Sequence, residues 1–103
     1  MFNKTRIFLT VQETPDCKWD IDNRGECFYK DIYEILPIQT GQSMSFRTRD
    51  ELYFTEIRSI MWLTDIAAMG VYTETINTKK EDYSNLCYVL ECQGWSVCKI
   101  NNI

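Results

Sequence analysis

The residues from Asp20 to Asp31 come closest to a recognisable chemical motif in this chain. Asp20, Asp22 and Gly25 occupy the first, third and sixth positions of a string that resembles a calcium-binding EF-hand loop. Arg24 places a cation at the fifth position, where such a loop needs an oxygen ligand. The twelfth position is Asp31, where the loop needs a bidentate glutamate. We therefore interpret the string as a polar turn and expect no metal site.

The cysteines supply neither a metal motif nor a catalytic pair. The chain contains no histidine, and no two cysteines stand in a C-x-x-C arrangement. Without histidine, a Ser-His-Asp or Cys-His apparatus cannot be built, and the sequence has no glycine-rich phosphate loop. An odd number of cysteines cannot pair completely within one chain, so we expect free, buried thiols in a reducing compartment. The five are Cys17, Cys27, Cys87, Cys92 and Cys98.

These absences predict a protein that is not an enzyme and that needs no cofactor. An enzyme that works with two carboxylates, or a subunit that needs a partner to complete its site, stays as an alternative from another class. The sequence does not single out such a pair, because any of the 15 acidic residues can be matched with another on paper.

Acidic and aromatic residues are interleaved between residues 12 and 34. This stretch carries seven acids against three bases. Binding hot spots favour an aromatic anchor inside a polar rim, and complementary charge speeds encounter. We therefore predict a partner-binding surface here, in which Trp19 or Tyr29 fills a pocket on the partner. The predicted binding residues are Asp16, Trp19, Asp20, Asp22, Glu26, Tyr29, Asp31 and Glu34. The alternative is a solvated hairpin whose aromatic residues belong to the core.

Length and charge narrow the class of partner. The chain has 103 residues, which predicts one domain over 1–103, and a formal net charge of −4. A nucleic-acid binder needs a basic stripe, and none is visible, so we expect a basic protein partner and no direct contact with nucleic acid. In size, charge and composition the chain is similar to small acidic immunity proteins. That likeness implies a monomer that blocks the active site of a basic toxin in a 1:1 complex. The toxin is expected to be a nuclease, for example of the contact-dependent growth inhibition type.

Two other functions fit the same composition. A phage-encoded inhibitor of a host or defence enzyme would share the size, the acidity and the richness in Asn, Ile, Thr and Tyr. A structural subunit would use Trp62 and Ile66 in its contact. The longest apolar stretch, residues 60–69, is interrupted by Thr64 and Asp65 and is too short to span a bilayer. The first 11 residues show no cleavage site for a secretory signal, so we expect a cytoplasmic protein.

Periodicity predicts an α+β fold: an antiparallel sheet of about five strands with one long helix packed on one face, and room for a second short helix. Alternation predicts strands at 5–11 and 17–21, with turn residues at 22–25 leading into a hairpin from residue 26 onward. Residues 27–36 fit a helix or a strand. A short strand is expected around 44–48, followed by a long helix from the capping box of Thr48 and Glu51 to Gly70. Further strands are expected at 71–76, 86–92 and 95–100, with a loop at 77–80 and a hairpin turn at Gln93 and Gly94.

Overall fold

The computed structural model describes residues 3–14, 24–48 and 51–98 of the chain. Within these ranges the chain forms seven strands and one helix. They are β1 (Lys4–Glu13), β2 (Gly25–Ile32), β3 (Ser43–Arg47), β4 (Leu52–Leu63), β5 (Ala68–Thr73), β6 (Ile76–Thr78), α1 (Lys80–Cys92) and β7 (Ser96–Val97). The expected α+β class is therefore confirmed, with more strands than predicted.

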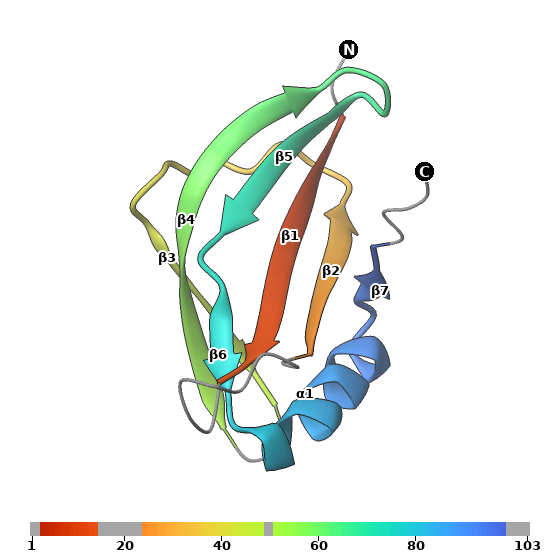
Figure 1. Ribbon diagram of the computed structural model, residues 1–103. Coiled ribbons are helices and arrows are strands. Elements are labelled where there is room, and N and C mark those ends of the chain that lie inside the picture. The colour runs from red at the N-terminus through yellow and green to blue at the C-terminus, as the bar shows by residue number, and fades with distance from the viewer. Residues whose placement is uncertain (1–2, 15–23, 49–50, 99–103) are drawn as a thin grey trace.

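All seven strands belong to one curled sheet, in the order β3-β4-β5-β1-β2-β7, with β6 paired to β1 (Figure 1). β2 pairs with β1 antiparallel, from Thr5 with Ile32 to Gln12 with Gly25. On its other edge β1 pairs in parallel with β5 and then with β6. The sheet is therefore mixed, not purely antiparallel as expected.

The expected strand at 5–11 is confirmed as the middle of β1, and its alternation explains why its two faces differ. Every second residue from Thr5 to Glu13 is buried, and Leu9 and Val11 are fully enclosed. Burying one such aliphatic side chain stabilises the fold by about 1.5–3 kcal/mol. The residues between them are half-buried or exposed on the opposite face. β1 therefore has a core face and an outer face.

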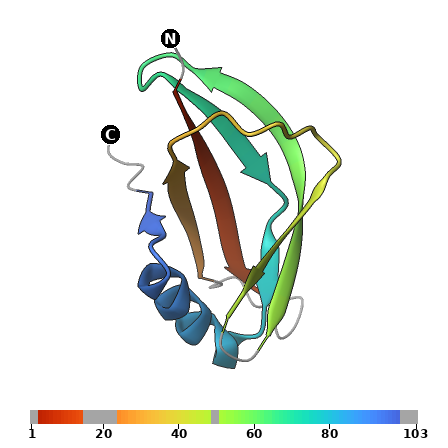
Figure 2. The same ribbon diagram turned by 180° about the vertical axis from the view of Figure 1, so that it is seen from behind.

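The core lies on the concave side of the sheet. Tyr83, Leu86 and Leu90 of α1 pack there against Leu9 and its neighbours. The connection from β2 to β3 crosses the same side in front of β1 and β5 in Figure 2, and it contributes partly buried Leu36 and Ile38. No helix among the described residues is long and apolar enough to cross a membrane.

The predicted long helix at 48–70 is wrong. The backbone N–H of Glu51 does donate to the Thr48 hydroxyl (3.2 Å), as a capping box requires, but the Thr48 N–H also donates to the Glu51 carbonyl (2.9 Å). That second bond closes a turn between β3 and β4. Leu52–Leu63 is then held as a strand by β3 on one edge and β5 on the other, so pairing overrides local propensity. Gly70 lies inside β5 and does not end a helix.

The predicted strand at 86–92 and its hairpin are also wrong, because these residues belong to α1. The buried residues Tyr83, Leu86 and Leu90 have helical spacing, and the first turn is acidic. Gly94, at φ 94°, ends the helix: its N–H donates to Glu91, and the Trp95 N–H donates to Leu90. This is a Schellman motif, which needs a left-handed residue after the helix.

The remaining element predictions have mixed outcomes. Residues 27–36, which fitted a helix or a strand, belong to strand β2 as far as Ile32. The short strand expected around 44–48 is confirmed as β3. The expected strand at 71–76 is split between β5 and β6, and β6 takes two residues of the expected loop. The strand expected at 17–21 lies outside the described residues, and β2 pairs with β1 where we expected a hairpin with that segment. Of the strand expected at 95–100, β7 covers Ser96–Val97, and residues 99 and 100 lie outside the described residues.

Ala67 offers a test of the turn that replaces the predicted helix. Its φ of 52° is left-handed, which costs an alanine about 1–2 kcal/mol. Ala67→Gly removes this cost. The glycine also raises the conformational entropy of the unfolded chain, which destabilises the fold by about 0.4–1 kcal/mol. We expect a net gain of about 0.5 kcal/mol in the free energy of unfolding, measured by urea denaturation. In a helix the same change would destabilise the protein by about 1 kcal/mol. Ala68→Gly, in buried β5, is the control and should destabilise.

Candidate functional site

The outer face of the sheet gathers side chains from three strands. The even-numbered residues of β1 point to this face, so Arg6 and Phe8 lie there. The register places Tyr29 of β2 opposite Phe8 on one side, and Tyr72 of β5 opposite Phe8 on the other. Cys27 lies on the same face of β2 as Tyr29, because side chains alternate along a strand. All five side chains are half-buried.

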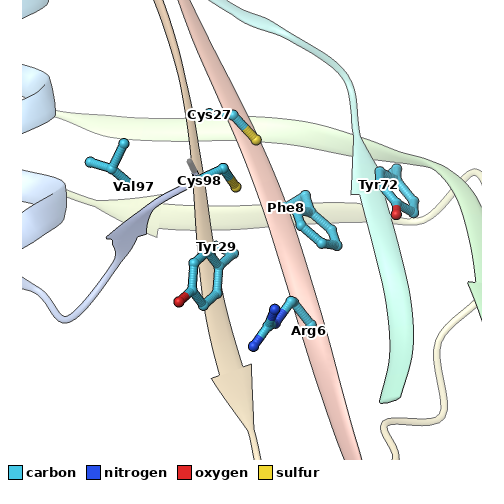
Figure 3. Close-up of a pocket in the computed structure, with 7 residues that line it drawn as sticks. All are labelled: Arg6, Phe8, Cys27, Tyr29, Tyr72, Val97 and Cys98. Carbon is cyan, nitrogen blue, oxygen red and sulfur yellow. The ribbon is translucent and has the colours of Figure 1, made fainter. Parts of the chain in front are cut away.

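These side chains line a pocket of about 660 Å³ (Figure 3). Two residues at the C-terminal end of the described chain complete it. The lining residues are Arg6, Phe8, Cys27, Tyr29, Tyr72, Val97 and Cys98. Such a volume lies within the range of sites that bind a small ligand.

Aromatic contacts hold the walls of the pocket. The rings of Phe8 and Tyr72 stack with centroids 4.7 Å apart and planes within 6° of parallel. The Arg6 guanidinium lies 4.2 Å from the centre of the Tyr29 ring. Stacked and cation–π contacts keep flat surfaces in place, so the pocket presents pre-ordered rings to whatever enters it.

The charge of Asp31 is matched within the chain. Its carboxylate accepts hydrogen bonds from Arg6 (Nε to Oδ1, 2.8 Å) and from Lys4 (Nζ to Oδ2, 3.2 Å). The hydrogen bond from Arg6 is the main reason why the pKa of Asp31 is lowered, and the same bond raises the pKa of Arg6. Asp31 therefore orients Arg6 over Tyr29, and a partner would meet the three charges together.

The structure distributes the other predicted binding residues over different places. Glu26 lies on the opposite face of β2 from Tyr29 and Asp31, where it faces Tyr83 and Cys87 of α1. Glu34 is exposed beyond the end of β2. Tyr29 and Asp31 are thus the two predicted residues that the sheet brings together. The other four, Asp16, Trp19, Asp20 and Asp22, lie outside the described residues.

Sequence reasoning missed most of the pocket. Arg6 and Phe8 were detectable, because they alternate with buried residues of β1 and so had to face away from the core. Tyr72 was not, because burial does not alternate along β5 and the pairing with Phe8 places this ring. Cys98 carried no such signal, because its contact with Cys27 of β2 joins residues 71 positions apart, and local periodicity does not indicate such a pairing.

The string that resembles a calcium loop has a different role at Arg24. The backbone N–H and the Nε of Arg24 donate to the two carboxylate oxygens of Glu13, each at 2.8 Å. The Arg24 guanidinium lies over the ring of Tyr83. These hydrogen bonds lower the pKa of the buried Glu13 carboxyl. Among the described residues, no group of three or more cysteine and acidic side chains is placed to hold a metal ion.

No family model, curated protein sequence or solved structure matches this chain. The chain's own features therefore carry the functional information: a half-exposed aromatic pocket, a guanidinium held over one of its rings, and an acidic segment that includes β2.

The ion pair of Asp31 predicts a pH-dependent stability. A lowered pKa means that the ionised carboxylate is favoured in the folded state. Its contribution is fully present above the unfolded pKa of about 3.9 and is lost as the pH falls through the lower folded value. Asp31→Asn should therefore be less stable than the wild type at neutral pH, and the difference should shrink below about pH 4 in urea denaturation.

The matched control is Asp65→Asn, at an exposed position between β4 and β5, which should change stability by less than about 0.5 kcal/mol. A difference for Asp31→Asn that stays constant down to about pH 3 would show that the ion pair does not stabilise the fold.

Proposed function

We propose that this chain is a protein-binding inhibitor that covers a functional surface of a basic partner without turning over a substrate. The observation that carries the proposal is the half-exposed aromatic pocket on the outer face of the sheet. Tyrosine is enriched at binding hot spots, because its ring buries a large area while its hydroxyl keeps a polar partner. Tyr29 and Tyr72 offer two such rings on a rigid sheet.

The acidic segment favours a basic partner. Residues 12–34 carry a net charge of −4, from seven acids and three bases, which equals the charge of the whole chain. This segment includes β2, the strand that carries Tyr29. Charge of one sign beside an aromatic site attracts a partner of opposite charge during encounter.

These features support the role of an immunity protein that neutralises a basic toxin in the cytoplasm, most simply a nuclease. A nuclease active site is lined with Lys and Arg that hold phosphates, so an acidic surface complements it. An aromatic side chain of the partner that enters the pocket would fix the register of the complex. We propose a 1:1 complex with a single copy of this chain.

The pocket can be tested with the variant Tyr29→Ser/Tyr72→Ser. Wild-type chain, immobilised, is used to capture its partner from a lysate of the native host, and the partner is then purified for calorimetry. The double variant should bind at least tenfold more weakly, because losing a hot-spot ring costs about 2 kcal/mol or more. Wild-type chain should also abolish the partner's activity at equimolar ratio.

Tyr88→Ser is the matched control, because Tyr88 is an exposed tyrosine of α1 that does not line this pocket. Circular dichroism should show that all variants keep the wild-type fold. Equal affinity of the double variant and the wild type would show that the interface does not include this pocket on the outer face. A partner whose activity survives equimolar wild-type chain would contradict inhibition.

The acidic segment predicts a kinetic effect. Asp20→Ala/Asp22→Ala should slow association with the same partner and flatten its dependence on ionic strength, measured by stopped-flow fluorescence. Glu81→Ala/Glu91→Ala, at two exposed positions of α1, changes the net charge equally and should leave most of the salt dependence intact. If both double variants slow association equally, net charge and not this segment attracts the partner.

A further inference from the structure

Cys27 and Cys98 face each other across two neighbouring strands. β2 and β7 are antiparallel, with Phe28 opposite Val97 and Tyr29 opposite Ser96, so the register continues to Cys27 opposite Cys98. The backbone confirms this step, because the Cys98 N–H donates to the Cys27 carbonyl at 2.8 Å. Both side chains line the outer-face pocket, and Figure 3 shows the two sulfur atoms on the same side of the sheet.

The spacing of such a pair suits a covalent bond between the sulfurs. Directly opposed residues of antiparallel strands have Cα atoms roughly 4.5–5.5 Å apart. Disulfides join residues whose Cα atoms are roughly 4.4–6.8 Å apart. The Cys27 thiol lies near enough to Cys98 to contribute to the raised pKa of the Cys98 thiol. Neither cysteine is in a disulfide in this structure.

We propose that Cys27 and Cys98 form a reversible disulfide that fastens β7 to β2 beside the pocket, with glutathione disulfide as the oxidant. β7 is a two-residue edge strand held to the sheet by two register pairs. A covalent bond one residue beyond those pairs would hold β7 against β2. Because both sulfurs line the pocket, the redox state of the pair also sets the shape and polarity of one pocket wall.

The exchange balances in two steps. The thiolate of Cys27 attacks one sulfur of glutathione disulfide and expels a glutathione thiolate. The sulfur of Cys98 then attacks the Cys27 sulfur, loses its proton to water and expels the second glutathione. Two protein thiols are oxidised, and one glutathione disulfide is reduced to two thiols.

The surroundings of Cys98 indicate why the reaction is slow at neutral pH. Burial, together with the neighbouring Cys27 thiol, raises the pKa of Cys98 to about 12, whereas the nearby Arg6 guanidinium lowers it. Few Cys98 thiolates therefore exist at pH 7, and the rate of closure should rise steeply with pH.

The test uses the wild-type chain. It is incubated with glutathione disulfide at mildly alkaline pH, alkylated and digested, and the peptides are mapped by mass spectrometry. We expect alkylatable thiols to fall from five to three and a cross-linked peptide to join residues 27 and 98. Closing so long a loop should raise the melting temperature by on the order of 10 °C. Dithiothreitol should reverse both effects.

Two variants serve as controls. Cys92→Ser removes an exposed thiol of α1 and should form the same cross-link. Cys98→Ser should retain glutathione on Cys27 and show no rise in melting temperature. The proposal fails if the wild type shows no 27–98 peptide. It also fails if glutathione stays bound to Cys27, or if Cys27 is joined to Cys17, Cys87, Cys92 or another chain.

Discussion

The pairing of β1 along both of its edges is the constraint on which the rest of the structure depends. One edge is bonded to β2 and the other to β5 and β6, so the strand can neither slide nor turn over. A slip by one residue would exchange its two faces. The correct register sends Leu9 and Val11 into the core and leaves Arg6 and Phe8 on the outer face. The same pairing thus determines both the core and the candidate site.

Two arginines then divide the acidic segment into charges used within the chain and charges left for other contacts. Arg24 satisfies the buried Glu13, and Arg6 satisfies Asp31. A buried carboxylate such as that of Glu13 would be costly without a partner, so the fold requires this pair. Asp31 is half-buried, and its pair adds stability. A count of acidic residues therefore overstates the charge that residues 12–34 offer to a partner. Glu34, exposed at the end of β2, is better placed for that role.

Sequence patterns located two strands with a local signal, overlooked the local signal of α1, and missed the elements that are decided by distant pairing. β1 and β3 follow from alternation alone. Leu52–Leu63 also has apolar residues at helical spacing, and its capping signature makes the same hydrogen bond in a helix cap and in a turn, so only β3 and β5 decide its structure. For α1 the acidic first turn and the spacing of Tyr83, Leu86 and Leu90 were readable. The part of the pocket on β1 could have been predicted, but Cys98 depends on a contact across 71 positions, from 27 to 98.

The parallel pairing of β1 affects how the chain folds while it is synthesised on the ribosome. β1 is made first, yet Lys4 pairs with Ala68, 64 positions later, so one edge stays open until more than half of the chain has been translated. An apolar strand with an open edge attracts other strands, including those of neighbouring nascent chains. Folding must therefore await late synthesis, and expression at lower temperature or with abundant chaperone should improve the yield of native protein.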